Sequence, residues 1–510
     1  MSELTRRSVL GAAASAVVTA GRPQPTGGHR PNILFICSDQ HSGAALGANG
    51  HGLVRTPNLD RLAAGGVNFR NAYCGSPVCV PGRASLMTGK FASDVGSYCN
   101  STPYNGSEGT WGTRLRQAGY DCWATGKMDL WLGRDLGFRE VGTSHGHSQN
   151  PDVTSLFRAP VCFRPGERDN VDGSFSHRRA PDQPKIDAAL AFLRQESKQT
   201  GRAWCAYVGL SKPHPKWNAA ASYEGMYPPS EMPLPSWPEG YLERRHIAFQ
   251  ILANFKNIQV PISKARIRLA RAAYYACISE VDELIGSLLA ELERTGQREN
   301  TIVVYTSDHG EMLGDHGLWL KNVLLENAVR IPMIVAGPGI PKGRTVETPV
   351  SHVDLVATML DLAGASVASG LRGHSLIPAA RGENGSHPGF AYSESHSEGN
   401  CTGSFLIRKG DWKYVYFTGG EPLLFNLKED PGEFRNLAAD TKSAGIREEL
   451  HAHLCSLVDP DSVTRASFRK QQSVLKQLVA GNSRQEFYRR LAGRLGPLQA
   501  RMITERHYTT

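Results

Sequence analysis

The sequence predicts an α/β fold with a large, mainly parallel central sheet, helices on both of its faces, and a smaller C-terminal antiparallel sheet. Continuous apolar runs of strand length alternate with helical patterns along most of the chain. Several of these runs end in acids, histidines or lysines. After about residue 390 the pattern changes to short alternating segments separated by tight turns, which is typical of an antiparallel meander.

The N-terminal part of the chain begins this alternation. NILFICSD predicts a buried parallel strand that ends in an acid. TPNLDRLAAGG predicts a helix with Thr56 as its N-cap, Pro57 at its first position and Gly65 as its stop. TWGTRLRQAGYDCWATGK then predicts a helix, a turn and a short strand that ends at Gly126 and Lys127.

The alternation continues to about residue 365. KIDAALAFLRQ predicts a helix, and AWCAYVGLSKPH predicts a strand that runs into a polar loop. A long amphipathic helix is expected over residues 263–294. NTIVVYTSDHGE and IPMIVAG predict two more strands, and HVDLVATMLDLAG predicts the helix after them. Together these segments indicate a doubly wound α/β domain.

Three regions are expected along the chain. Residues 1–29 read as a signal peptide and linker, residues 30–390 as the catalytic domain, and residues 391–510 as a C-terminal subdomain with a small antiparallel sheet and a helical tail. Within the catalytic domain, residues 215–260 are rich in Pro, Tyr, Trp and Met and lack periodicity. They predict a long surface excursion over a site.

The N-terminus carries the features of an export signal. MSELTRRSVLGAAASAVVTAG places Arg6 and Arg7 before a short, alanine-rich apolar stretch with small residues at its end. Adjacent arginines favour twin-arginine export, with an ordinary Sec signal as the alternative. No later segment reaches about 18 apolar residues, so we expect a periplasmic or secreted protein without integral membrane association.

Composition limits the classes of partner. The 510 residues carry a formal net charge of +9, which fits an anionic substrate or surface and equally fits no charged partner. The basic residues are scattered, so we expect no nucleic acid. Ten cysteines are too few and too dispersed for a disulfide scaffold. Cys37, Cys205 and Cys277 lie in apolar runs and are expected in the core, whereas Cys79 has unusual neighbours.

Candidate site residues follow the predicted strands. Asp39 ends one strand, and Asp308 with His309 ends another. Lys127 and His214 follow two more. Ligands of open α/β sheets bind at the carboxyl ends of the strands, so these groups are expected at one edge. Two carboxylates with few thiols favour Ca²⁺ or Mg²⁺, and a histidine ligand leaves Mn²⁺ open.

The stretch CGSPVCVPGRASLMTGK carries a more specific signal. Cys79-Val80-Pro81-Gly82-Arg83, followed by TGK, resembles the C-x-P-x-R signature of the sulfatase family, within the alkaline-phosphatase-like superfold. The resemblance covers most of residues 30–440 and extends to PNILFICSDQ, TPNLDRLAAGGVNFRNAY, TGKMD, KPHPKW, SDHGEMLGDHGLWLK and RIPMIVAGPGI. Within the family, the chain is most similar to the arylsulfatase K-like and choline-sulfatase-like branches.

The resemblance implies a nucleophile made by modification. A maturase would oxidise Cys79 to Cα-formylglycine, whose hydrated aldehyde is a geminal diol held by Arg83. One hydroxyl attacks sulfur and expels the alcohol. The other hydroxyl then loses its proton, and sulfate leaves by elimination. The resemblance further implies two sets of residues. The metal ligands are Asp39, Cys79, Asp308 and His309, and the substrate contacts are Lys127, His214 and Lys321, with His214 or Lys321 as proton donor to the leaving oxygen.

Four positions depart from the usual family pattern. Gln40 stands where many sulfatases have a second aspartate, and His309 where many have asparagine. Gly82 replaces a common serine without altering the maturase signature. Asp129 replaces the histidine of G-K-x-H, and either meets a substrate hydroxyl or accepts a hydrogen bond from Lys127.

The sequence therefore predicts a sulfuric ester hydrolase that acts on a sulfated sugar, with a 2-O-sulfated uronate as one candidate. The alternatives are a phosphonate monoester or phosphodiester hydrolase with the same nucleophile, a choline or aryl sulfatase, and a silent binder of sulfated glycans. The binder is disfavoured because every catalytic position is filled.

Overall fold

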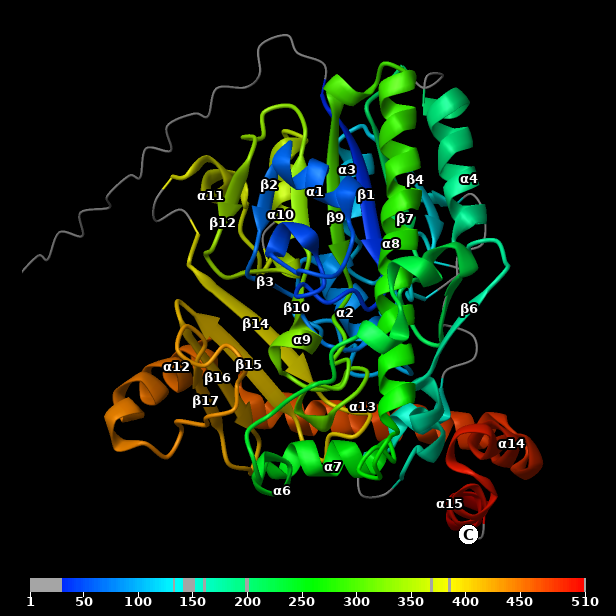
Figure 1. The fold of residues 1–510 in the computed structure, drawn as a ribbon, viewed down its shortest axis with the longest axis vertical. Helices are drawn as coiled ribbons and strands as arrows, with labels where there is room; N and C mark the ends of the chain where they lie inside the picture. The colour runs from blue at the N-terminus through cyan, green and yellow to red at the C-terminus, as the bar shows by residue number, and fades with distance from the viewer. Residues whose placement is uncertain are drawn as a thin grey trace, which may run out of the picture.

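An eight-stranded sheet forms the middle layer of the molecule (Figure 1). The computed structural model describes residues 30–131, 134–140, 152–158, 162–197, 201–366, 370–383 and 387–508. The expected signal peptide, residues 1–29, lies outside this range. The strands follow the order β12 (Arg344–Val346), β2 (Val67–Phe69), β11 (Met333–Ala336), β9 (Thr301–Ser307), β1 (Asn32–Ser38), β7 (Trp204–Gly209), β4 (Asp121–Gly126) and β5 (Arg139–Glu140).

Five adjacent strands, from β9 to β5, run parallel. β1 lies between β9 and β7, where Asn32 pairs with Thr301 on one side and Ile33 pairs with Cys205 on the other. The expected mainly parallel sheet is confirmed. The IPMIVAG strand, β11, is antiparallel to both β9 and β2, because the chain returns from β9 without a crossover helix.

The alternation of side chains along β1 separates two apolar cores. Ile33, Phe35 and Cys37 face the core that contains residues of α2, α3 and α10. Leu34 and Ile36 face the core that contains residues of α1, α4 and α8. All five side chains are fully buried, which is why NILFICS is apolar throughout. The flanking helices are α1 (Pro57–Ala64), α2 (Cys79–Thr88), α3 (Trp111–Gln117), α4 (Gln183–Ala191), α8 (Lys264–Arg294) and α10 (His352–Leu362).

The start of α1 differs in one detail from the expectation. Thr56 occupies the N-cap position, but its hydroxyl donates to Asp60 and caps no backbone N–H of the helix. The N–H groups of Asn58 and Leu59 instead donate to the carboxylate of Asp282 in α8, at 3.0 and 2.8 Å. A long-range carboxylate has replaced the local cap, and this also fixes α1 against α8.

Residues 215–260 contain more regular structure than the sequence predicts. β8 (Trp217–Ala220) pairs with β6 (Gly173–Ser176), and α6 (Tyr241–Arg244) precedes α7 (Ile247–Phe255). The prediction of an irregular excursion was wrong for α7, which buries Phe249, Leu252, Ala253 and Phe255. Short helices are hard to separate from loops when the flanking sequence is rich in proline.

The C-terminal part has its own antiparallel sheet, with strands β14 (Phe390–Ser395), β15 (Ser404–Lys409), β16 (Trp412–Phe417) and β17 (Leu423–Asn426). These strands, yellow to orange, lie below the central sheet in Figure 1. Four helices follow: α12 (Ala444–Leu457), α13 (Pro460–Gly481), α14 (Arg484–Leu495) and α15 (Pro497–Tyr508). Other short strands and α-helices of the described residues are β3 (Ala72–Tyr73), β10 (Arg330–Ile331), β13 (Val350–Ser351), α9 (Glu326–Val329) and α11 (Ile377–Arg381).

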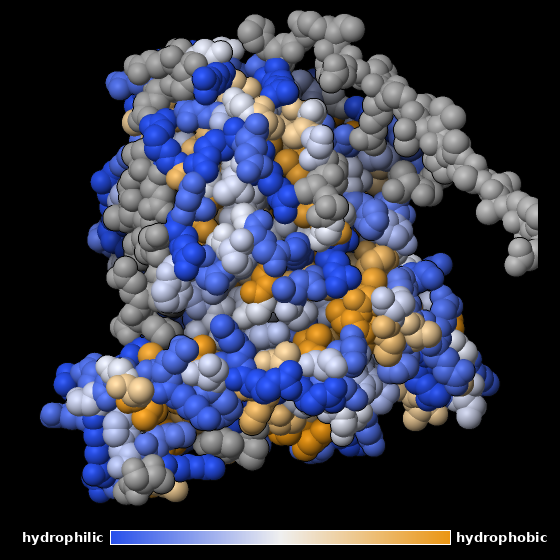
Figure 2. Space-filling model, turned by 180° about the vertical axis from the view of Figure 1, so that it is seen from behind, coloured by the Kyte–Doolittle hydropathy of each residue, from blue (hydrophilic) through white to orange (hydrophobic). Residues whose placement is uncertain are grey.

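One face of the molecule is seen in space-filling form in Figure 2. Hydrophilic residues predominate on the face shown in Figure 2, and apolar residues occur there in separate groups. Among the described residues, no helix combines the length and the apolar character needed to cross a membrane.

Candidate active site

Five predicted site residues follow strands of the parallel region. Asp39 comes directly after β1, Asp308 and His309 directly after β9, and Lys127 directly after β4. His214 lies in the loop after β7. Because these strands are parallel neighbours, their carboxyl ends share one edge of the sheet, where the side chains meet.

Cys79 is the first residue of α2, at the end of the helix where backbone N–H groups point outward. Val78 before it is extended, and Val80 N donates to Asn100 Oδ1 at 3.2 Å. A Cβ at Gly82 would lie 2.8 Å from the carbonyl oxygen of Ser76 and 3.0 Å from that of Asp308. Glycine here lets α2 approach the Asp308 backbone closely, an effect that the sequence did not reveal.

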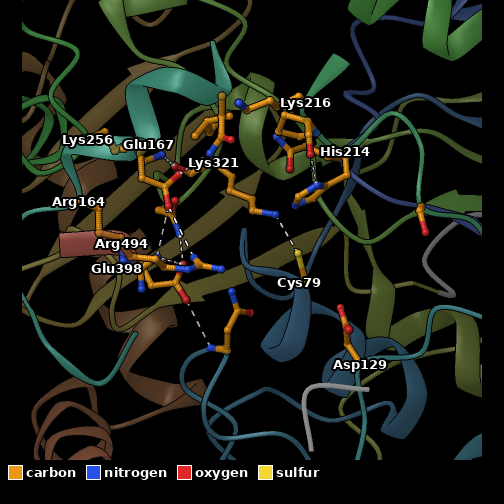
Figure 3. A pocket seen from close by; sticks show the side chains of 18 of the residues that line it. Cys79, Asp129, Arg164, Glu167, His214, Lys216, Lys256, Lys321, Glu398 and Arg494 are labelled. Atoms are coloured by element: carbon orange, nitrogen blue, oxygen red, sulfur yellow. Dashed lines mark hydrogen bonds and ion pairs between the residues drawn. The ribbon is translucent and has the colours of Figure 1, made fainter. Parts of the chain in front are cut away.

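The thiol of Cys79 faces the other predicted groups. Its Sγ lies 2.8 Å from Lys321 Nζ, 3.3 Å from His309 Nε2 and 4.0 Å from Asp39 Oδ1. Burial, together with the negative charge of Asp39, raises the pKa of Cys79 to about 12. Figure 3 shows Lys321 reaching toward Cys79, with the His214 ring on the same side.

The residues present fit a divalent metal ion. One ligand atom from each of Asp39, Cys79, Asp308 and His309 lies within 4.8 Å of the others, and all four side chains are buried. His309 Nδ1 contacts the carbonyl oxygen of Gly310 at 3.0 Å, which leaves Nε2 facing the group. Carboxylate oxygens with one imidazole suit a hard or borderline cation.

Gln40 adds an oxygen that the sequence analysis did not count. Its side chain is fully buried, Nε2 donates to Glu311, and Oε1 has no hydrogen-bond partner among the described residues. An orphaned buried oxygen beside Asp39 can complete a cation site. Gln40 also has a left-handed backbone, with φ of 71°, and its N–H donates to Asp308 Oδ1 at 3.0 Å. The backbone thus joins the two strand ends.

Arg83 lies against the carboxylates. Its Nε donates to Asp308 Oδ2 at 2.9 Å, and Nη2 lies 3.6 Å from Asp39 Oδ2. Nη1 donates to the Lys127 carbonyl oxygen at 2.6 Å and to the Tyr207 hydroxyl at 2.9 Å. The side chain is fully buried. These contacts support the two acidic ligands, in addition to the diol-holding role expected from the sequence.

The charged groups of the site are matched in number. Burial disfavours ionisation of Asp39, but Lys127, Lys321 and Arg83 outweigh it and hold the pKa of Asp39 well below its usual value. Burial also works against Lys127, yet the charges of Asp129 and Asp39 raise its pKa well above the usual value. The set contains three carboxylates and three cations: Asp39, Asp129 and Asp308 with Arg83, Lys127 and Lys321.

Asp129 and His214 flank this set. Asp129 Oδ2 lies 3.1 Å from Lys127 Nζ and 3.8 Å from Arg83 Nε, which is the Lys127 contact considered from the sequence. His214 Nδ1 contacts the Pro215 carbonyl oxygen at 2.7 Å, so Nε2 is the nitrogen left for substrate. Burial lowers the pKa of His214 to about 3, so the ring is neutral at physiological pH.

A cavity of about 850 Å³ opens over these groups. It extends from His214 and Cys79 past Lys321 to Arg494 of α14 (Figure 3). Seven lysines and arginines line it against three acids, so its wall carries excess positive charge. The sequence analysis missed the more distant lining residues, among them Arg164, Lys256 and Arg494, because no motif marks them.

Fold and site together define a hydrolase of anionic esters, and comparison with known proteins identifies the family. The chain belongs to the sulfatase family: the Sulfatase family model matches residues 31–365, and a model described as N-sulphoglucosamine sulphohydrolase, C-terminal, matches residues 314–459. The protein is therefore a sulfuric ester hydrolase.

Among curated relatives, arylsulfatase K of Danio rerio is 31% identical over 487 residues, covering 89% of each chain. Choline-sulfatase of Rhizobium meliloti (strain 1021) is 33% identical over 438 residues, covering 81% of this chain and 83% of the relative. These relatives match the two branches expected from the sequence.

Two solved structures are similarly related. Phosphonate monoester hydrolase of Agrobacterium radiobacter superposes with a TM-score of 0.70 and 26% identity, covering 84% of this chain and 95% of the other. A protein described as a 2-O GAG sulfatase superposes with a TM-score of 0.67 and 26% identity, covering 86% and 93%. Both likenesses confirm the expected sulfatase-like fold.

Proposed function

We propose that this protein is an exported, formylglycine- and metal-dependent sulfatase that removes sulfate from a sugar, with a 2-O-sulfated uronate as the preferred candidate. The observation that carries the proposal is the placement of Cys79. It starts α2 within a C-x-P-x-R signature, and its Sγ lies inside the group of candidate metal ligands, 2.8 Å from Lys321. A buried structural thiol has no need of these neighbours.

Two groups are added to the chain in this proposal. A maturase converts Cys79 to formylglycine, whose hydrated form supplies a nucleophilic hydroxyl and a second hydroxyl that permits release of sulfate. A divalent ion, Ca²⁺ with Mg²⁺ or Mn²⁺ as alternatives, supplies charge neutralisation and a lowered hydroxyl pKa. Asp39, Asp308 and His309 hold it with the modified Cys79, and Gln40 Oε1 is available to join them.

The chain's own residues then bind and orient the ester. Lys127 forms an ion pair with Asp39, and Lys321 donates a hydrogen bond to Cys79. Both ammonium groups therefore lie where they can bind the sulfate oxygens of a substrate. Lys321 Nζ is placed to donate to the leaving oxygen. His214 was the alternative donor expected from the sequence, but the N–H of its neutral ring is Nδ1, which faces the Pro215 carbonyl oxygen, so Nε2 can only accept a hydrogen bond from substrate. Arg83 keeps the carboxylates of Asp39 and Asp308 in place.

The cavity favours a substrate larger and more anionic than an aryl sulfate. A space of about 850 Å³ with seven basic and three acidic lining residues suits a charged saccharide, because uronates add a carboxylate to the sulfate. The similarity to a protein described as a 2-O GAG sulfatase supports a 2-O-sulfated saccharide, such as a uronate 2-sulfate. We assign residues 30–390 to the catalytic domain and residues 391–510 to a subdomain that adds Glu398 and Arg494 to the cavity wall.

A phosphonate monoester hydrolase is the second candidate. It is favoured by the structural similarity to the Agrobacterium enzyme, which superposes with a TM-score of 0.70. Phosphonate monoesters and sulfate monoesters both carry one negative charge, so the positive cavity does not separate them.

A panel of substrates tests the proposal. Purified protein would be assayed with 2-O-sulfated uronate disaccharides, other sulfated saccharides, choline sulfate, an aryl sulfate and an aryl phosphonate monoester. We expect the highest kcat/KM with the uronate 2-sulfate. A higher kcat/KM with the phosphonate monoester would favour the phosphonate monoester hydrolase over the sulfatase. A preference for choline sulfate or a simple aryl sulfate would refute a sulfated sugar as the substrate.

A further inference from the structure

The loop that carries Lys321 needs support from outside itself. The residues on either side, Leu320 and Asn322, adopt left-handed backbone conformations with φ of 66° and 78°. Such conformations are unfavourable for residues with a Cβ and persist only when the surroundings hold them. The position of Lys321 Nζ at Cys79 therefore depends on what fixes the backbone of residues 319–322.

Glu311 fixes this loop from the side of the metal-ligand group. Its Oε1 accepts the N–H groups of Leu313 and Leu320 at 2.8 and 2.7 Å, and its Oε2 accepts from Gln40 Nε2. The side chain is buried. This contact holds the N–H side of Leu320 but leaves the carbonyl groups of the loop to other partners.

Lys256 holds the carbonyl side. This lysine is the C-cap residue that follows α7, and its Nζ donates to the carbonyl oxygens of Trp319, at 3.0 Å, and of Lys321 itself. The side chain is only 1% exposed. Figure 3 shows Lys321 between Lys256 and Cys79. The ammonium thus bridges the two carbonyls that flank Leu320.

Burying the Lys256 ammonium is energetically unfavourable, which indicates that the group has a specific role at this position. Burial lowers the pKa of Lys256 to about 8, against the charges of Glu167, Glu311 and Glu398, while the charge of Lys321 lowers it further. Among the described residues, no carboxylate forms an ion pair with Lys256 within 4.0 Å. Two backbone carbonyl oxygens accept hydrogen bonds from its ammonium group instead. A lysine that served only to bind an anion from the cavity would not need both carbonyls.

We propose that Lys256 is a positioning residue, which fixes the backbone at Lys321 and so keeps the Lys321 ammonium at the reacting group. The inference rests on the proposed function of Lys321 as a substrate contact. It also gives the 215–260 segment a role in the reaction, because α7 reaches the reaction centre through Lys256. Changes in α7 that alter substrate fit would then also alter the chemical step.

Four enzymes test this: wild type, Lys256→Met, Lys321→Ala and the double variant. Each would be assayed with aryl sulfates whose phenols range from acidic to weakly acidic. Lys256→Gln keeps an N–H donor group on a shorter, neutral side chain and shows whether partial bridging restores activity. Lys216→Met, an exposed lysine of the same cavity wall, reports what the loss of cavity charge alone does. Thermal melting confirms that each variant is folded.

We expect Lys256→Met to reproduce the leaving-group profile of Lys321→Ala in a weaker form, with kcat reduced about 10-fold or more for the poorest leaving group. Lys256→Gln should lie between Lys256→Met and wild type. Adding Lys256→Met to Lys321→Ala should change kcat by less than about 2-fold, because positioning has no effect once the positioned group is gone. Lys216→Met should raise KM alone.

Additive losses in the double variant, or a Lys256→Met effect confined to KM as in Lys216→Met, would overturn the inference. A crystal structure of Lys256→Met separates this failure from failure of the proposed function. If Lys321→Ala is fully active, the proposed role of Lys321 as a substrate contact is wrong. The positioning of Lys321 by Lys256 then stands only if the Lys256→Met structure shows that Lys321 Nζ has left its place beside residue 79. An unmoved Lys321 would refute positioning by Lys256 in every case.

Discussion

Replacing Asp308 tests how the buried charges of the site depend on one another. Asp308→Ala removes a proposed metal ligand and the nearest carboxylate to Arg83, at 2.9 Å. Breaking a fully buried ion pair typically costs about 3–5 kcal/mol. Arg83 keeps Asp39 at 3.6 Å, the Lys127 carbonyl at 2.6 Å and the Tyr207 hydroxyl at 2.9 Å. Because Arg83 keeps these partners, we expect Asp308→Ala to lower the free energy of unfolding by about 3 kcal/mol, the lower end of that range.

Such a loss leaves the chain folded, because domains are commonly stable by about 5–15 kcal/mol. Activity should fall much further. A catalytic metal supplies several kcal/mol of transition-state stabilisation, so kcat/KM should drop about 1000-fold or more. Denaturant melts of the chelated wild type and variant measure the first effect, and sulfatase assays with added metal measure the second.

Asp308→Asn is the matched control. An amide oxygen can still accept the N–H groups of Gln40 and His309, which Asp308 Oδ1 now accepts at 3.0 and 2.9 Å. We expect this variant to regain part of the stability but little of the activity, since the charge is still missing. Wild-type activity in either variant, or unfolding of Asp308→Ala before any chelation, would refute the charge argument.

Four further predictions follow from the same structure. Thorough chelation should abolish activity yet leave a folded protein, because three cations already match three carboxylates in the site. Metal at 100 times its Kd should then add about 2.7 kcal/mol to the free energy of unfolding. A metal-free enzyme with full activity would contradict this prediction. Cys79→Ser should lose turnover and retain, if anything, a sulfated serine, which intact-protein mass spectrometry would detect; sustained turnover would exclude the proposed release step. Replacing Arg6 and Arg7 by lysines should trap active, uncleaved enzyme in the cytoplasm, whereas normal export would rule out the twin-arginine route. A Sec signal in its place should deliver protein with less formylglycine, as measured by peptide mass spectrometry, and full modification would argue against oxidation before export.

The sequence predicted the parts of the fold whose patterns arise from burial. NILFICS and TIVVYTS are continuous apolar runs because β1 and β9 are covered on both faces, so composition alone identifies them. The direction of β11 could not be predicted in this way, because an apolar run does not specify the strand that it pairs with. Thr56 was misjudged as a capping side chain because its replacement, Asp282, lies more than 200 residues away.

The residues around Cys79 could be predicted because they follow strands or lie in short motifs. Lys321, His214 and the acids then meet at the sheet edge without further information. The support around them could not be predicted. The helix α7, the carbonyl contacts of Lys256 and the close approach at Gly82 depend on tertiary packing, which leaves no periodic signal in the sequence.

The central claim is that Cys79 becomes the nucleophile by oxidation to formylglycine. Mass spectrometry of the proteolytic peptide that spans Cys79, taken from an active preparation with measured specific activity, tests it most directly. We predict a peptide that lacks one sulfur and two hydrogens, has gained one oxygen, and forms a hydrazone with an aldehyde-selective reagent. The modified fraction should rise in proportion to specific activity across preparations. An active preparation that contains only unmodified cysteine at position 79 would contradict the account.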